Sequence, residues 1–133
     1  MAEFSKFMKI VLSINIFAAF IYGILYLFIP EFYSSLVDAP NYNPLFFRLW
    51  GATCTSLGIV GILAFLRNNW EQFKILFEFV ILWLIIQDIV NLTSFSYLAR
   101  SPTNIASQWT DIVIIILLII IDIYAYLKEN KNE

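Results

Sequence analysis

An ionisable side chain inside an apolar stretch is the feature of this sequence that points most directly to chemistry. Asp88 lies within the mostly apolar run Ile75–Leu98 and has Gln87 and Asn91 beside it. A carboxyl group at mid-membrane depth is costly, and such groups usually face a bundle interior or a water-filled cavity. Asp88 is therefore the first candidate for a ligand contact or a proton site.

Helical periodicity gathers further polar residues into the same zone. Positions three, four, seven or eleven apart share a helix face, and each residue advances the helix by about 1.5 Å. Two clusters follow from this spacing. The main one, in the outer half of the membrane, is the candidate ligand-binding set Arg48, Asp88, Asn91, Asp111, Tyr22, Tyr26 and Gln87. The weaker one, near the inner edge, is Asn15, Glu78 and Asp122.

The charges within the apolar runs are unbalanced. Four acids lie there, at positions 78, 88, 111 and 122, and Arg48 is the basic residue well inside a run. Arg48 is expected to pair with Asp88 or Asp111, or to hold an anionic head group in a bidentate manner. The sequence leaves these partners open.

The same residues have a structural alternative. Hydrogen bonds between membrane helices contribute about 0.6–2 kcal/mol each and hold bundles together without binding any ligand. This alternative is favoured for Gln87 and Asn91, and it remains as open as ligand contact for Arg48 and Asp88. The small-residue stripe Gly51, Thr55, Gly58 and Gly61 is interpreted as helix packing.

The elements that must position these groups are membrane helices. Of the 133 residues, 61% are hydrophobic and only 14% are charged, against about a quarter in soluble domains. Four apolar runs each exceed the roughly 20 residues that span a bilayer. The sequence thus predicts one all-α domain over 1–133, an antiparallel bundle of four transmembrane helices. The spans are about 8–29, 45–66, 75–98 and 105–127.

The basic residues predict the orientation. Six lie on the side of the two termini, against Arg48 and Arg100 on the other side, so both termini are expected in the cytoplasm of a multi-pass plasma-membrane protein. The six are Lys6, Lys9, Arg67, Lys74, Lys128 and Lys131.

The connections carry their own expectations. Pro30 can start a short helix, and the aromatic loop 30–44 is either an interfacial anchor or a lid over an outer pocket. Trp70, in the polar turn 67–72, is expected to anchor at the interface. The charged tail 128–133 is expected to fray.

Several chemistries are excluded by what the sequence lacks. It has no His, and Cys54 is its only cysteine, so bis-histidine haem, zinc hydrolase and dithiol chemistry are ruled out. No nucleotide-binding or hydrolase motif is present. We predict no catalytic residue, metal or cofactor, and the absence of a basic stripe argues against a nucleic-acid partner.

Two stretches resemble a known group. They are YGILYLFIP at 22–30, with its closing proline, and RLWGA at 48–52, continuing to LGIVG at 57–61. Over the first half of the chain these resemble the small DoxX-like four-helix membrane proteins. The resemblance implies a four-helix bundle and no agreed chemistry.

The leading hypothesis is a non-enzymatic membrane protein that binds a lipid or small amphiphile in an outer-half pocket between its helices. Arg48 would hold the head group, Asp88 and Asn91 would line the floor, and Tyr22 and Tyr26 would form the walls. One alternative is a structural or assembly subunit, as a homo-oligomer or with a partner membrane subunit. Another is a proton-coupled transporter or a lipid-modifying enzyme that uses Asp88.

Overall fold

The protein is all-α over the part of the chain that its computed structural model describes, residues 3–98 and 101–131. Four of its helices are long and apolar enough to cross a membrane, which confirms the predicted architecture at this level and is consistent with a small multi-pass membrane protein. The elements are α1 (Lys6–Gly23), η1 (Ile24–Phe28), α2 (Pro30–Leu36), α3 (Pro44–Arg67), α4 (Trp70–Leu98) and α5 (Pro102–Asn130). Arg100, one of the residues used to predict orientation, lies outside the described residues.

Short polar residues set where the helices begin. The hydroxyl of Ser5 accepts from the amide of Met8 at 3.1 Å, and the hydroxyl of Ser101 caps α5 in the same way. Asn43 caps α3, and Pro44 takes the first helical position, where a missing N–H costs nothing. These caps lie outside the apolar runs, so the helices extend a few residues beyond the predicted spans.

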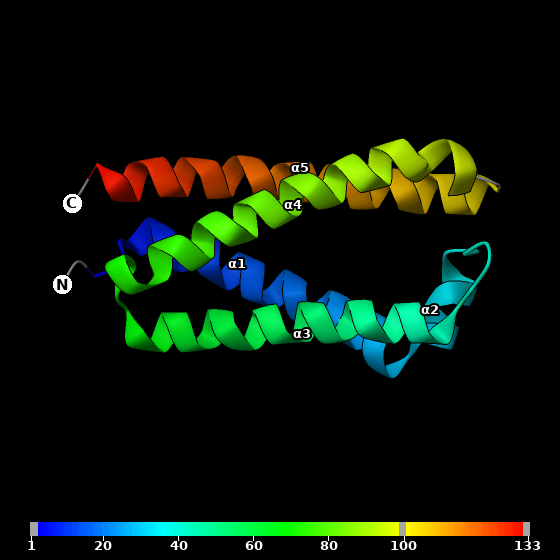
Figure 1. The fold of residues 1–133 in the computed structure, drawn as a ribbon, viewed down its shortest axis with the longest axis horizontal. Coiled ribbons are helices and arrows are strands. Elements are labelled where there is room, and N and C mark those ends of the chain that lie inside the picture. Colours follow the sequence, from blue (N-terminus) through cyan, green and yellow to red (C-terminus); the bar gives the residue numbers. More distant parts are fainter. Residues whose placement is uncertain (1–2, 99–100, 132–133) are drawn as a thin grey trace.

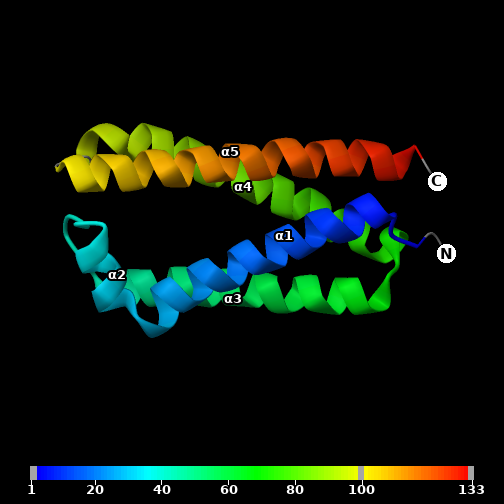
Figure 2. The ribbon, with the colours of Figure 1, turned by 180° about the vertical axis from the view of Figure 1, so that it is seen from behind.

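The helices form two hairpins, α1 with α3 and α4 with α5, which meet where α1 contacts α5 (Figures 1 and 2). The N- and C-termini and the α3–α4 turn lie at one end, here called the termini end. Although α3 and α4 are consecutive, their backbones make almost no close contact. Consecutive helices with short connections are usually antiparallel neighbours, and this pair departs from that rule.

Glycine explains why α3 turns toward α1 instead. A Cβ atom at Gly51 would lie 2.4 Å from the backbone nitrogen of Leu27, and one at Gly61 would lie 2.7 Å from Cγ1 of Ile16. Small residues permit this close approach of helices in lipid. The small-residue stripe of α3 is thus packing within the molecule, as interpreted from the sequence.

An aromatic core closes the termini end. Trp70 is fully buried there and meets Phe4 and Phe77 edge to face. The expected interfacial role of Trp70 is wrong, because helix α4 starts at this residue and turns its side chain inward. The core consists of Phe4, Met8, Val11, Leu12, Ala64, Trp70, Phe73, Phe77 and Ala125.

The end of α5 is part of the same closure. The amide of Ser5 donates to Oε1 of Glu129 at 2.6 Å, and the indole of Trp70 donates to Asn130 at 3.3 Å. The expected fraying from residue 128 is therefore wrong up to Asn130, because the side chains of Glu129 and Asn130 bond to Ser5, which caps α1, and to Trp70 at the start of α4. At the other end, here called the α2 end, the two hairpins lie farther apart (Figure 1).

Candidate functional site

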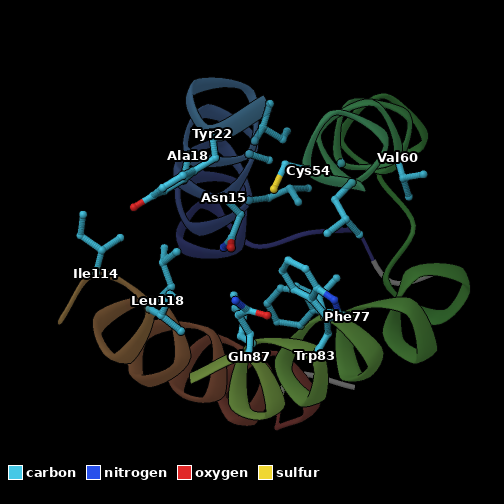
Figure 3. A pocket seen from close by; sticks show the side chains of 18 of the residues that line it. Asn15, Ala18, Tyr22, Cys54, Val60, Phe77, Trp83, Gln87, Ile114 and Leu118 are labelled. Atoms are coloured by element: carbon cyan, nitrogen blue, oxygen red, sulfur yellow. The ribbon is translucent and has the colours of Figure 1, made fainter. Parts of the chain in front are cut away.

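The space between the two hairpins contains a cavity of about 150 Å³, here called the central cavity. Its wall is contributed by α1, η1, α3, α4 and α5 and is mostly aliphatic and aromatic. Figure 3 shows Asn15 from α1 and Gln87 from α4 pointing into it, with Leu118 of α5 on its wall. The cavity exists because α3 and α4 diverge after their short turn.

Five residues of the predicted ligand-binding set line the central cavity. The hydroxyl of Tyr22 donates to Oδ1 of Asp111 at 2.7 Å, which joins α1 to α5. The amide of Gln87 donates to Oδ1 of Asn91 at 3.3 Å, one turn along α4. Tyr26 is the fifth. These five side chains therefore lie around one space.

Asn15 provides a second polar contact at the cavity wall, nearer the termini end. Its amide donates to Oδ1 of Asp122 at 2.7 Å, and Asp122 is fully buried. Two of the three members of the weaker predicted cluster thus meet. Glu78, its third member, is exposed and instead accepts a hydrogen bond from the hydroxyl of Tyr126.

A short π-helix brings Tyr26 to the cavity. Helix α1 widens at η1, where α3 approaches most closely at Gly51. Single π-turns within helices are frequent at functional sites. The ring of Tyr26 lies 6.2 Å from that of Tyr22, 4.8 Å from Tyr33 and 5.2 Å from Phe47, so it joins the cavity to the aromatic loop.

Helix α2 connects the two hairpins at the α2 end. Tyr33 is buried and shares side-chain hydrogen bonds with Tyr26 and with Ser107 of α5. The amide of Asn104 reaches the carbonyl of Val37 at 3.4 Å. Burial, aided by the nearby carboxylate of Asp111, raises the pKa of the Tyr33 hydroxyl, which therefore stays protonated and able to donate.

These contacts attach the segment 30–44 to both hairpins, and none of its described residues lines the cavity. The opposite face of α2 is apolar and exposed, with Phe32 60% and Leu36 58% accessible. That face is suited to the headgroup level of a membrane, as the anchor interpretation expects. The lid interpretation stays a prediction.

Arg48 does not take the predicted position. Its nearest acidic partner is Glu31 at the start of α2, with Nη2 and Oε1 3.5 Å apart, and both side chains are more than half exposed. It does not line the central cavity, and the expected pairing with Asp88 or Asp111 is not formed. The reason is local, because the turn of α3 at Gly51 is pressed against η1 and directs Arg48 toward α2.

Asp88 is also outside the central cavity. It is buried, with 7% of its surface accessible, and its Oδ1 has no hydrogen-bond partner within the described part of the chain. Asp88 follows Gln87 directly, and one residue turns a helix by 100°. That rotation turns the carboxyl group away from the face that carries Gln87 and Asn91. Asp88 is therefore next to Gln87 in the sequence but is not on the same wall of the cavity.

Two tryptophans of the cavity wall were missed by the sequence argument. Trp50 of α3 and Trp83 of α4 stack with ring centroids 5.2 Å apart and bridge the gap between these helices. A signal was present, because Trp83 lies at the middle of its helix whereas membrane tryptophans gather at the interfaces. A tryptophan at mid-depth indicates an internal surface.

The site offers no evident metal centre. In the described ranges, no group of three or more Cys, Asp or Glu side chains is arranged to hold a metal ion. Comparisons with family models, curated proteins and solved structures found no match to this chain. The function must therefore be argued from the cavity itself.

Proposed function

We propose that this chain is a small multi-pass membrane protein that binds a lipid or another small amphiphile in the central cavity and catalyses no reaction. The observation that supports this proposal is the composition of the cavity wall, which is apolar and aromatic on all sides and interrupted by a few polar groups. Small-molecule sites generally combine a mostly apolar lining with a small number of placed polar contacts.

The size of the cavity limits what it holds. At about 150 Å³ it matches the engineered apolar cavities that accept one benzene molecule. A head group or one ring fits, and the rest of an amphiphile would extend from the cavity along the helices. The proposal therefore concerns recognition of one end of the ligand.

The polar contacts of this proposal differ from the original hypothesis. Asp111, Tyr22 and the Gln87–Asn91 pair take the place of Arg48 and Asp88, since these four side chains line the cavity, as does Tyr26. Helix α2 would cover the ligand, because Tyr33 contacts both Tyr26 and Ser107.

The glycine stripe offers no association surface for the first alternative, a structural or assembly subunit. Its glycines are already pressed against α1 and η1, so a homo-oligomer or a partner subunit would need another face.

The orientation of the chain in the membrane and its family membership are also part of the proposal. Both termini are placed in the cytoplasm of a plasma-membrane protein, supported by the positive-inside rule. The six basic residues of the sequence argument belong to the helix ends and the turn at the termini end. Membership in the DoxX-like group rests on the sequence resemblance and is likewise proposed.

Native mass spectrometry of the full chain in mild detergent tests the binding function. We expect the wild type to retain a lipid or amphiphile. The Ala18→Trp variant should lose it, because the larger side chain fills the cavity that Ala18 lines. Ala52→Trp makes the same change on the exposed side of α3 and should retain the ligand. Arg48→Ala should retain it too.

A wild type without any bound amphiphile, from detergent and from native-lipid nanodiscs, would overturn the proposal. So would equal retention by Ala18→Trp, provided that the variant unfolds at the temperature of the wild type.

A further inference from the structure

The charge of the central cavity has one sign. Among the described residues that line it, Asp111 carries the one carboxyl group, and none is a lysine or an arginine. Arg48, two residues before the lining residue Trp50, is exposed and engaged with Glu31. Any ligand that enters the cavity therefore meets a carboxyl group without a protein cation to balance it.

Asp111 retains capacity for a ligand. A carboxylate has about four acceptor positions, and the hydroxyl of Tyr22 occupies one of them. Tyr22 also fixes the carboxyl group in place, since its hydrogen bond is only 2.7 Å long. Asn91, which lines the same cavity, accepts from Gln87 through its side-chain oxygen, and a carbonyl oxygen has a second lone pair.

The rings around this carboxyl group add a second preference. Tyr22 and Tyr26 line the cavity from α1 and η1, and the Trp50–Trp83 stack lines it from α3 and α4. Faces of tyrosine and tryptophan rings attract cations, more strongly where water is excluded. An acid enclosed by aromatic rings thus complements a positively charged group on an apolar body.

We infer that the ligand of the central cavity is an amphiphilic amine, with its ammonium group at Asp111 and its apolar body against the tryptophans. This inference rests on the proposed binding function and specifies the ligand class. An ammonium supplies donors only, and it neutralises a carboxylate that hydrocarbon surroundings disfavour. A phosphate or carboxylate head would instead oppose Asp111 with no base on the wall.

A matched set of three probes tests the head group: 4-phenylbutylamine, 4-phenylbutanol and 4-phenylbutanoate. They share one apolar body, and isothermal titration calorimetry on the full chain in mild detergent gives the affinity of each. We expect the amine to bind the wild type most tightly and the carboxylate least tightly. Asp111→Asn should weaken the amine by at least about tenfold, as expected for loss of a charged hydrogen bond, and change the alcohol much less.

Two further variants control for folding and for charge elsewhere. Glu71→Gln removes an exposed carboxylate in the first turn of α4, away from the cavity wall, and should leave amine affinity unchanged. Asp111→Glu keeps the charge and should keep the preference for the amine even if Asp111→Asn unfolds. Mass spectra of the same samples separate the two sources of an ammonium, a lipid head group and a free amine, because the bound species differ in mass.

Equal binding of alcohol and amine, or full amine affinity in Asp111→Asn, would overturn the amine inference. The binding function would survive that result if Ala18→Trp abolished binding of the preferred probe. Failure of all three probes on a wild type that retains a native lipid would also overturn only the amine inference. Failure of all three on a ligand-free wild type would overturn both proposals.

Discussion

The side-chain amide of Asn15 lies 2.7 Å from the carboxylate of Asp122 and joins the first hairpin to the second beside the central cavity. Asp122 is fully buried, and its second oxygen, Oδ2, has no partner in the described part of the chain. The two hairpins contact each other over a limited area, mainly where α1 meets α5. Asn15–Asp122 is thus one of several polar contacts between the hairpins, together with Tyr22–Asp111 and Ser5–Glu129.

Asn15→Ala should destabilise the protein by about 1–3 kcal/mol, because it leaves a buried acceptor without its donor. The measurement is the thermal unfolding midpoint in detergent. Ser13→Ala on the same helix is the control, since Ser13 is exposed and bonds only to the carbonyl of Lys9. An unchanged midpoint for Asn15→Ala would show that this contact does not hold the hairpins together.

Gly51→Ala should be more harmful than Gly58→Ala. The added Cβ at position 51 would collide with backbone atoms of η1 at 2.4 Å, whereas at position 58 it would meet only the ring of Phe20 at 3.0 Å. Overpacking typically costs about 1–3 kcal/mol, and backbone yields less readily than a side chain. We expect Gly51→Ala to lower the unfolding midpoint further and also to weaken ligand retention, since η1 positions Tyr26. The reverse order of the two variants would contradict this packing.

Asp88→Leu should raise the unfolding midpoint, because it replaces a buried carboxyl oxygen that has no partner. The expected gain is about 1–3 kcal/mol, the usual penalty for such a group. Amphiphile retention should stay at the wild-type level, since Asp88 does not line the cavity. Val90→Leu, at an exposed site on the same helix, controls for added apolar volume. If a stable Asp88→Leu protein no longer retained the amphiphile, Asp88 would belong to the functional site after all.

The turn between the hairpins offers a paired test at Asn68. This residue has φ of 50° and its side chain accepts from the amide of Phe4 at 3.1 Å. The Asn68→Gly variant lacks the hydrogen-bond acceptor, but glycine adopts the left-handed backbone without strain. The Asn68→Ala variant lacks the acceptor and is also strained in that backbone conformation. The free energy of unfolding should therefore fall from wild type to the glycine variant to the alanine variant, with a total loss of about 1–3 kcal/mol for the alanine variant. Thermal unfolding midpoints should follow the same order. Equal midpoints for the two variants would show that the backbone is not strained there.

Much of the fold could be predicted because the hydrophobic run length fixes the number of spans. Proline and short polar residues added the helix starts, as at Pro30 and Pro44. What sequence could not supply was the pairing of helices. A consecutive pair is usually adjacent, and it is the contacts of Gly51 with Leu27 and of Gly61 with Ile16 that reveal that α3 packs against η1 and α1.

The site was predictable where angles on a single helix decided the outcome. Tyr22, Asn91 and Asp111 follow from periodicity and depth, and they do line one cavity. Arg48 and Asp88 failed for different reasons. The partner of Arg48 lies on a loop helix whose position no periodicity gives, and Asp88 is one 100° step away from the relevant face.

If the central cavity binds an amphiphile as we propose, the divided architecture links the amount of protein in the cell to that ligand. A molecule held between two hairpins contributes to their association, and it binds the assembled state only. By mass action, ligand at a hundred times its dissociation constant would add about 2.7 kcal/mol to stability. Cellular proteases remove the transiently opened fraction. Starving a cell of the amphiphile should therefore shorten the lifetime of this protein before it alters anything else about it.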